Sequence, residues 1–292
     1  MMKCLVSTML AALLAGATTA AAEDTPSPAP AEFAAMPACQ ALQTKYPGLK
    51  GKELVVGLGG YNKGFQSPKA GNPDQLEGLD PDMFDRLGAC LGFTYKFQLG
   101  AFNVLITSLT SGRIDIGPSL YVTPARLEQV AFVSSYQVID GSVVAKGNPK
   151  KLTSLDDLCG MTISAAAGTF EASTLAPEQT KKCLEAKKPA VDVLLVQNTD
   201  NAIMAVQAGR ADIHLTSAAV ARGLVAADPK LERAFDVNLP IRNGYPIAKE
   251  NTELRSAITE GIKIIQDTGV QKKLLEKWGQ GGDAERPVEN LG

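Results

Sequence analysis

Arg126 carries a guanidinium, a group whose chemistry suits an anion. It comes shortly after Thr123-Pro124, a pair that opens a helix, so its guanidinium stands in a proline-started helical turn. A guanidinium presents a planar fork of donors that matches the two oxygens of a carboxylate. Thr169 follows Gly168 before another predicted helix, where free N–H groups and the helix dipole favour an anion. The simpler alternatives are an exposed helix arginine and a plain helix cap.

Residues that could support catalysis or hold a metal ion are scarce. His214 is the one histidine, and its apolar neighbours on a predicted strand favour a packed or surface role over a catalytic one. Gly57-x-Gly59-x-x-Asn62 follows a strand, as a dinucleotide fingerprint would, but lacks the last glycine. Neither Gly-x-Ser-x-Gly nor Cys-x-x-Cys occurs. We therefore expect no metal, no cofactor and no enzymatic activity.

A helix–glycine–strand unit occurs twice and indicates how the chain is organised. Ser-Gly-Arg-Ile-Asp-Ile at 111–116 returns as Ala-Gly-Arg-Ala-Asp-Ile at 208–213, and each copy follows an apolar helical pattern. In each, the glycine can end a helix before an apolar strand begins. The repeat predicts two similar α/β lobes, each a mainly parallel sheet flanked by helices. A cleft between two lobes is where a small ligand would bind.

Strands and helices alternate along the rest of the chain, which favours parallel sheets. Asp80-Pro81 is expected to start a helix with Asp80 as its cap. Strands are predicted at residues 53–58, 93–97, 114–116, 142–145, 161–165, 191–196, 212–215 and 245–248. Helices are predicted at 103–111, after 123–124, after 168–169, at 200–208 and over 254–265.

The amino terminus predicts export. Residues 1–22 combine a basic Lys3, a short apolar run and Ala20-Ala21-Ala22, as a cleavable signal peptide does. The Pro/Ala-rich residues 23–36 are expected to form a flexible or extended leader. Net charge is only −2, without a basic block, which argues against nucleic acid or an anionic membrane as partner. We expect a periplasmic monomer.

Four of the five cysteines lie beyond the signal peptide, and an even number in an oxidising compartment favours disulfides. Three pairings are possible. We favour Cys39–Cys90 and Cys159–Cys183, because each bridge then stays within one lobe. Four buried free thiols are the alternative.

Several segments, in order, resemble a known family. They are Gly78–Met83, Thr123–Arg126, Val130–Ser134, Ser154–Gly160 with Ala167–Thr169, and Leu274–Gly279, which ends in Lys-Trp-Gly. Together they resemble the family 3 periplasmic solute-binding proteins, the polar amino-acid receptors of ABC importers. The resemblance runs from about Leu54 to Trp278, nearly all of the chain beyond the leader.

The resemblance implies two lobes joined by two crossings, near Tyr136–Gly141 and Pro240–Gly244. The expected division is a signal peptide at 1–22, an N-terminal segment at 23–51, lobe 1 at 52–138 plus 244–292, and lobe 2 at 139–243. Hinge closure would trap the ligand and deliver it to the permease subunits. By the same resemblance, Arg126 clamps the α-carboxylate of the ligand, helped by Ser119 and the backbone near Tyr121.

Two departures from the family concern the cationic end of the ligand. The family often carries an aspartate at the position of Ser217, to hold an α-ammonium group. It also often carries an acid in the first-lobe loop, where this chain has Gly59-Gly60-Tyr61-Asn62. Aromatic residues map to or beside the cleft instead: Tyr61, Phe65, Phe102, Tyr121 and Phe170. Their faces attract cations, although core packing is the alternative for the phenylalanines. Glu171 is the nearest candidate acid, with a solvated helix face as its alternative.

These departures predict a small zwitterion that is betaine-like, ectoine-like, opine-like or guanidinium-bearing. The ectoine-binding members of the family also set an aromatic five residues before the arginine, as Tyr121 stands here. Two rival functions remain open. One is an enzyme on the same fold, since cyclohexadienyl dehydratases resemble these receptors, and the other is a receptor that feeds a membrane sensor.

Overall fold

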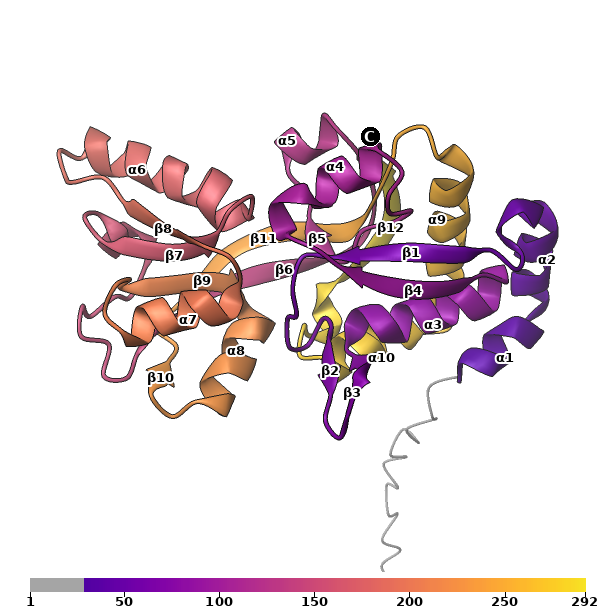
Figure 1. Ribbon diagram of the computed structural model, residues 1–292, viewed down its shortest axis with the longest axis horizontal. Helices are drawn as coiled ribbons and strands as arrows, with labels where there is room; N and C mark the ends of the chain where they lie inside the picture. Colours follow the sequence, from indigo (N-terminus) through magenta and orange to yellow (C-terminus); the bar gives the residue numbers. More distant parts are fainter. Residues whose placement is uncertain (1–28) are drawn as a thin grey trace, which may run out of the picture.

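The computed structural model describes residues 29–292, and in it the chain forms two α/β lobes side by side (Figure 1). The predicted signal peptide, residues 1–22, lies outside the described residues. Two long antiparallel strands, β6 (Ala131–Ala145) and β11 (Asp236–Ile247), run through both lobes and join them. No helix of the described part is long and apolar enough to cross a membrane.

The first lobe is built around the parallel pair β1–β4. Ile116 bridges this pair to the carboxyl end of β11, through Val56 on one side and Ile247 on the other. The elements of this lobe are β1 (Glu53–Leu58), the hairpin β2 (Ser67–Lys69) and β3 (Asn72–Glu77), α3 (Leu79–Leu91), β4 (Thr94–Leu99), η2 (Phe102–Val104), α4 (Leu105–Thr110), β5 (Leu120–Tyr121), α5 (Pro124–Leu127), α9 (Thr252–Asp267), α10 (Val270–Lys277), η5 (Gly282–Ala284) and β12 (Glu285–Leu291).

The second lobe is built around β7, which pairs in parallel with β8 on one side and β9 on the other. β9 then pairs with the distal half of β6 in antiparallel fashion, so the crossing strand closes the sheet. The elements are η3 (Leu155–Leu158), β7 (Thr162–Ala166), η4 (Glu171–Leu175), α6 (Ala176–Glu185), β8 (Asp192–Val196), α7 (Thr199–Gln207), β9 (Ile213–Ser217), α8 (Ala218–Ala227) and β10 (Leu231–Glu232).

The crossing itself is visible in the pairing of β6. Residues Phe132 to Tyr136 of β6 pair with β12 of the first lobe, whereas Asp140 to Val143 pair with β9 of the second. β11 has a register shift between Val237 and Ile241 at the same level. The lobe limits given above, 52–138 plus 244–292 and 139–243, stay predictions.

The two sequence repeats have the same local structure. α4 and α7 each end at a glycine with a left-handed backbone, Gly112 at φ 70° and Gly209 at φ 66°. The next residue in each copy, Arg113 or Arg210, donates its N–H to the helix five residues earlier over 2.9 Å. The predicted helix–glycine–strand unit is therefore confirmed at the helix end of both copies.

Several element predictions were wrong in extent. The strands expected at 142–145 and 245–248 are the ends of the long β6 and β11, because polar residues at the crossing interrupt their apolar pattern. Of the strand expected at 114–116, Ile116 alone makes a bridge. Asp80 does not cap its helix: Gly78 holds that position and Asp80 lies inside α3.

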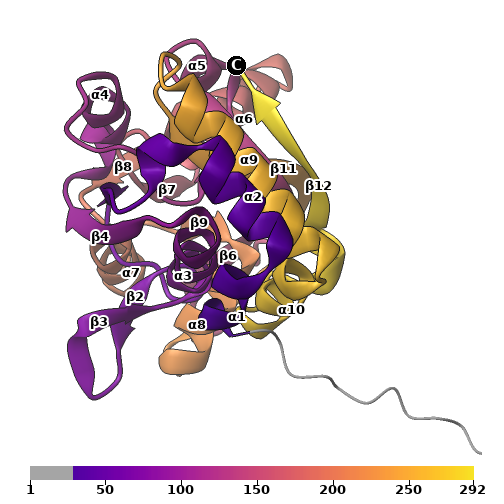
Figure 2. The same ribbon diagram turned by 90° about the vertical axis from the view of Figure 1, so that its right-hand side faces the viewer.

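The expectation of a flexible leader was wrong for residues 30–36. Residues Pro30–Ala35 form helix α1, whose Phe33 is fully buried, and Pro37–Lys45 form α2. α1 packs on α3 and α2 lies along α9, on the first lobe (Figure 2). Alanine is the best helix former and proline suits the first turn, so a Pro/Ala-rich segment can fold once its one aromatic residue is buried.

Both favoured disulfides are confirmed. Cys39 of α2 pairs with Cys90 of α3, with their Cα atoms 4.7 Å apart. Cys159, after η3, pairs with Cys183 of α6, with Cα atoms 5.5 Å apart. The first bridge ties the amino-terminal helices to the first lobe, and the second lies within the second lobe.

Candidate ligand-binding site

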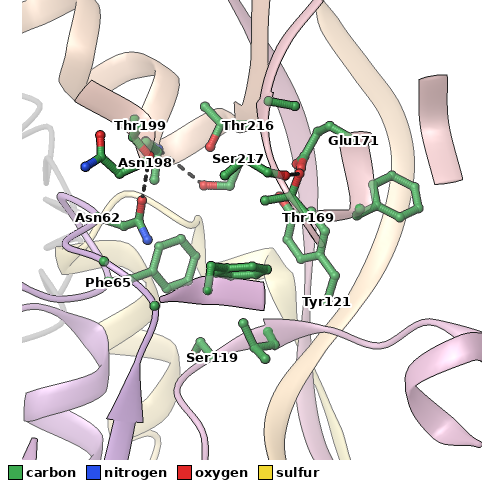
Figure 3. Close-up of a pocket in the computed structure, with 18 of the residues that line it drawn as sticks. Asn62, Phe65, Ser119, Tyr121, Thr169, Glu171, Asn198, Thr199, Thr216 and Ser217 are labelled. Carbon is green, nitrogen blue, oxygen red and sulfur yellow. Dashed lines mark hydrogen bonds between the residues drawn. The ribbon is translucent and has the colours of Figure 1, made fainter. Parts of the chain in front are cut away.

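A pocket that is open to solvent at its mouth lies between the two lobes (Figure 3). Loops of the first lobe line one side, and the carboxyl ends of β7 and β9 line the other. All nine residues proposed from the sequence as ligand-binding lie in its wall: Tyr61, Phe102, Ser119, Tyr121, Arg126, Thr169, Phe170, Glu171 and Ser217. Their roles toward a ligand stay predictions.

Arg126 is buried, at 8% exposure, and is held in place through its backbone and through its guanidinium. Its backbone N–H donates to the Thr123 hydroxyl that caps α5, over 3.3 Å. Its Nη1 donates to the Tyr121 carbonyl over 2.6 Å and its Nη2 to the Gly168 carbonyl, in the other lobe, over 3.0 Å. Gly168 has a left-handed backbone, φ 84°, which a glycine adopts without strain. Arg126 therefore links the lobes across the pocket.

Phe102 serves Arg126 rather than standing free for a ligand cation. The Arg126 guanidinium carbon lies 5.6 Å from the centre of the Phe102 ring, within the range of a cation–π contact. Phe102 packs directly against the backbone of Gly59, because Gly59 has no side chain. A Cβ at position 59 would lie 2.8 Å from the Phe102 Cα. The face of Phe102 that we expected to receive the ligand's cation is therefore already in contact with Arg126.

Ser119 is engaged differently from the expectation. Its backbone N–H donates to Asp80 Oδ2 over 3.1 Å, and its hydroxyl donates to Asp80 Oδ1. The single hydroxyl proton is thus used, and Ser119 Oγ can only accept from a ligand. Asp80 is fully buried, and burial raises the pKa of its carboxyl to about 6 against the hydrogen bonds from Ser119. Asp80 acts by positioning the Ser119 loop.

The remaining predicted residues lie on the second-lobe side or at the mouth. Thr169 Oγ1 accepts from the Ala172 N–H over 3.4 Å, so it caps the turn that becomes η4. Ser217 Oγ accepts from the Val220 N–H over 3.3 Å and caps α8. Tyr61 is 47% exposed at the pocket mouth.

Glu171 is buried in the pocket wall, and a second acid that sequence reasoning missed lies close to it. Asp140 of β6 is fully buried, and its Oδ1 accepts from the Tyr121 hydroxyl over 2.5 Å. Burial and the nearby Asp140 charge raise the pKa of Glu171 to about 8, opposed by Arg126. Burial raises the pKa of Asp140 to about 6, opposed by the hydrogen bond from Tyr121. The pocket therefore holds two carboxyl groups and one guanidinium.

Several acceptors around the pocket have no hydrogen-bond partner within residues 29–292. Gln66 Oε1 and Asn243 Oδ1 line the pocket and are buried, and Asp140 Oδ2 lies behind it. His214 also lines the wall: its Nδ1 lies 2.9 Å from the Ser164 carbonyl, and burial lowers its pKa, which favours the neutral ring. Buried acceptors without partners are costly, so the site favours a ligand rich in donors.

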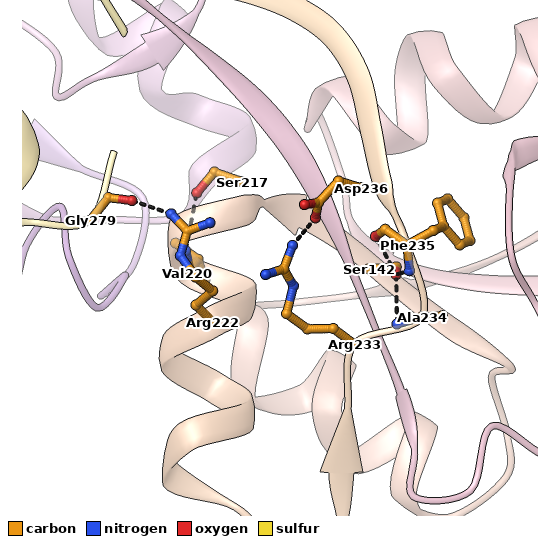
Figure 4. Close-up of polar contacts among 9 residues, drawn as sticks. All are labelled: Ser142, Ser217, Val220, Arg222, Arg233, Ala234, Phe235, Asp236 and Gly279. Carbon is orange, nitrogen blue, oxygen red and sulfur yellow. Dashed lines mark hydrogen bonds and ion pairs between the residues drawn. The ribbon is translucent and has the colours of Figure 1, made fainter. Parts of the chain in front are cut away.

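The lobes also touch outside the Arg126 contact. Thr199 at the start of α7 donates to Asn62 Oδ1 over 3.2 Å (Figure 3). Further away, Arg222 of α8 donates to the Gly279 carbonyl beyond α10, whereas Arg233 pairs with Asp236 within its own lobe (Figure 4).

Among the described residues, no group of three or more His, Cys, Asp or Glu could hold a metal ion.

Comparison with known proteins decides the family. Residues 54–281 match the family described as bacterial extracellular solute-binding proteins, family 3. The chain belongs to this family. The resemblance inferred from the motifs is thereby confirmed, and the fold is the two-lobed architecture of periplasmic binding proteins.

Relatives of this solute-binding protein are known by sequence and by structure. The arginine-binding extracellular protein ArtP of Bacillus subtilis is 26% identical over 232 residues, 78% of this chain and 86% of ArtP. A probable amino-acid ABC transporter periplasmic-binding protein, y4tE of Sinorhizobium fredii, is 26% identical over 221 residues, 70% of each chain. A crystal structure of a mutant ArgBP from T. maritima is 25% identical with a TM-score of 0.68, covering 83% of this chain and 99% of that one.

Proposed function

We propose that this solute-binding protein is the receptor of an ABC importer and closes around an amino acid that carries a cationic group with N–H donors. The observation that carries the proposal is the presence, in one interlobe pocket, of the buried Arg126 guanidinium and the buried Glu171 carboxyl group. A zwitterionic ligand offers a charge of opposite sign to each. The relatives named for arginine binding and for an amino-acid ABC transporter support the same class.

The carboxylate of the ligand is assigned to Arg126. Two carbonyls, of Tyr121 and Gly168, each accept one of its N–H groups, which fixes the plane of the guanidinium. Because a guanidinium has five N–H donors, others remain for a carboxylate. A ligand carboxylate held there would lie between the lobes and would favour the closed arrangement over an open one.

The cationic group is assigned to the Glu171 side of the pocket. Glu171 offers a carboxyl group there, and Gln66 Oε1 and Asn243 Oδ1 offer further acceptors in the pocket wall. Guanidinium-bearing carboxylates, including opines that contain arginine, offer the most N–H donors among the ligand classes left open above. Ectoines offer fewer and betaines none, so a betaine would leave buried acceptors unpaired.

Calorimetry with a matched set of ligands tests this function. We expect L-arginine to bind at least about tenfold more tightly than L-citrulline, in which the guanidinium is replaced by a neutral group, a difference of roughly 1.4 kcal/mol. Agmatine, which lacks the carboxylate, and glycine betaine, which lacks N–H donors, should bind more weakly still. Tightest binding of betaine, or of alanine or serine, would contradict the proposal.

A further inference from the structure

We infer that Asp140 is the second acid of the cation subsite: Asp140 and Glu171 hold one proton between them in the unliganded protein, and a cationic ligand displaces it. The inference rests on the proposed function and deepens it. Asp140, which is not among the residues that line the pocket, would then help to determine ligand specificity. Binding of a cationic ligand would release a proton.

The position of Asp140 supports this role. β6 and β9 pair so that Asp140 lies directly opposite Ser217. Ser217 lines the pocket and stands where other members of the family often carry an aspartate. Opposite residues of an antiparallel pair have their Cβ atoms within about 4.5–5.5 Å of each other. The carboxyl group that Ser217 does not supply on β9 is thus supplied by Asp140, opposite it on the neighbouring strand β6.

The surroundings of Asp140 are incomplete for an isolated carboxylate. The side chain is fully buried, Oδ1 accepts from the Tyr121 hydroxyl, and Oδ2 has no hydrogen-bond partner in the described part of the chain. An ionised carboxylate in such a site needs a proton or a neighbouring cation. Glu171, also buried and close enough to interact by charge, needs the same.

The groups that face the pair do not neutralise both acids. They are Tyr121 of β5, which donates to Asp140 Oδ1, and Thr169 and Arg126, which interact with Glu171. Burial keeps Tyr121 protonated, so among these groups of the described chain Arg126 supplies the positive charge. Its Nη1 and Nη2 donate to carbonyl groups, and a ligand carboxylate would engage it further. The ligand's own cation must then replace the shared proton.

Isothermal titration of the wild-type protein with L-arginine measures the proton directly. Titrations at pH 7 in phosphate and in Tris, which differ in ionisation enthalpy, give the number of protons exchanged on binding. We expect release of close to one proton by the wild type. Asp140→Asn and Glu171→Gln should each cut the release to below half and weaken binding at least tenfold. The control Glu178→Gln, on the exposed side of α6, should leave both values unchanged.

The outcomes separate this inference from the proposed function. Tight L-arginine binding by the wild type without proton exchange would overturn the inference and leave the function standing. Normal affinity and normal proton release in Asp140→Asn would do the same. Failure of the wild type to bind any cationic amino acid would overturn both. Thermal unfolding of each variant checks that it is folded, and the wild-type measurement decides the matter if a variant is not.

Discussion

Asp115 and Asp212 occupy equivalent places in the two lobes. Asp115 Oδ2 accepts from the Val55 N–H at the start of β1, and Asp212 Oδ2 accepts from the Thr162 N–H at the start of β7, both over 2.9 Å. Each aspartate also donates its own N–H to the carbonyl of the same residue. The sequence repeat is therefore one structural device used twice, which fixes a helix end to the first strand of each lobe.

Removing either carboxylate should destabilise the protein by a similar amount. Asp115→Ala and Asp212→Ala each leave a strand N–H without its partner, which typically costs about 1–3 kcal/mol. Asp→Asn at the same positions keeps an acceptor oxygen and should cost less. Urea unfolding measures the free energies, and a negligible effect of both alanine variants would show that the repeat has no structural role.

Arg126→Ala should abolish useful ligand binding while the fold survives. The variant removes the partner of a ligand carboxylate and also the hydrogen bond to Gly168 in the other lobe. Loss of one member of a buried charge pair costs on the order of 3–5 kcal/mol. Arg126→Lys keeps the charge but not the fork and should fall in between. Calorimetry with L-arginine is the measurement, with the exposed Arg113→Ala as control.

Phe102→Ala tests which cation the ring serves. Because the ring lies against Arg126, its loss should weaken L-arginine and L-citrulline by the same factor, about 3–10-fold, through a less ordered guanidinium. If the ring instead contacts the cation of the ligand, as the sequence led us to expect, L-arginine should lose more than L-citrulline. The ratio of the two dissociation constants distinguishes these roles.

Arg222→Ala tests whether contacts outside the pocket contribute to closure. Arg222 joins α8 to the Gly279 carbonyl in the other lobe, so its loss should weaken ligand binding by about 3–10-fold without touching the ligand. Arg233→Ala is the matched control, because Arg233 pairs with Asp236 inside one lobe (Figure 4). Small-angle scattering should show a larger radius of gyration for unliganded Arg222→Ala only. Equal affinities in both variants would argue against this contact as a closure determinant.

The pH dependence of stability should report Asp80. Its pKa is raised by burial from 3.8 to about 6, so the folded state binds this proton more tightly than the unfolded chain does. That contribution is complete below pH 4 and is lost as pH rises to 6, by up to about 3 kcal/mol. Asp80→Asn should reduce the fall in the free energy of unfolding over this range by up to about that amount, measured by urea at several pH values. The fall contributed by Asp140, whose pKa burial also raises to about 6, should remain. The exposed Asp74→Asn should keep the wild-type slope.

Local patterns, together with the family resemblance, predicted the two-lobed fold, the favoured disulfide pairing and nine residues of the pocket wall. The repeat with Gly112 and Gly209, the helix cap before Arg126 and the glycine turn before Thr169 each extend over a few residues. Such features specify helix ends and turns directly, because the backbone conformation they need is set by the residues themselves. The carboxyl ends of strands then collect the site residues at the cleft.

Only the tertiary structure decided which groups meet across elements. Asp140 has no local pattern that marks it; its importance comes from pairing with β9 and from the approach of Tyr121 and Glu171. The contact of Phe102 with Arg126 likewise depends on two separate loops. Burial and the distances between charges are set only when distant segments of the chain pack together. The pKa of a buried acid and the partner of an aromatic ring therefore cannot be predicted from a local sequence pattern.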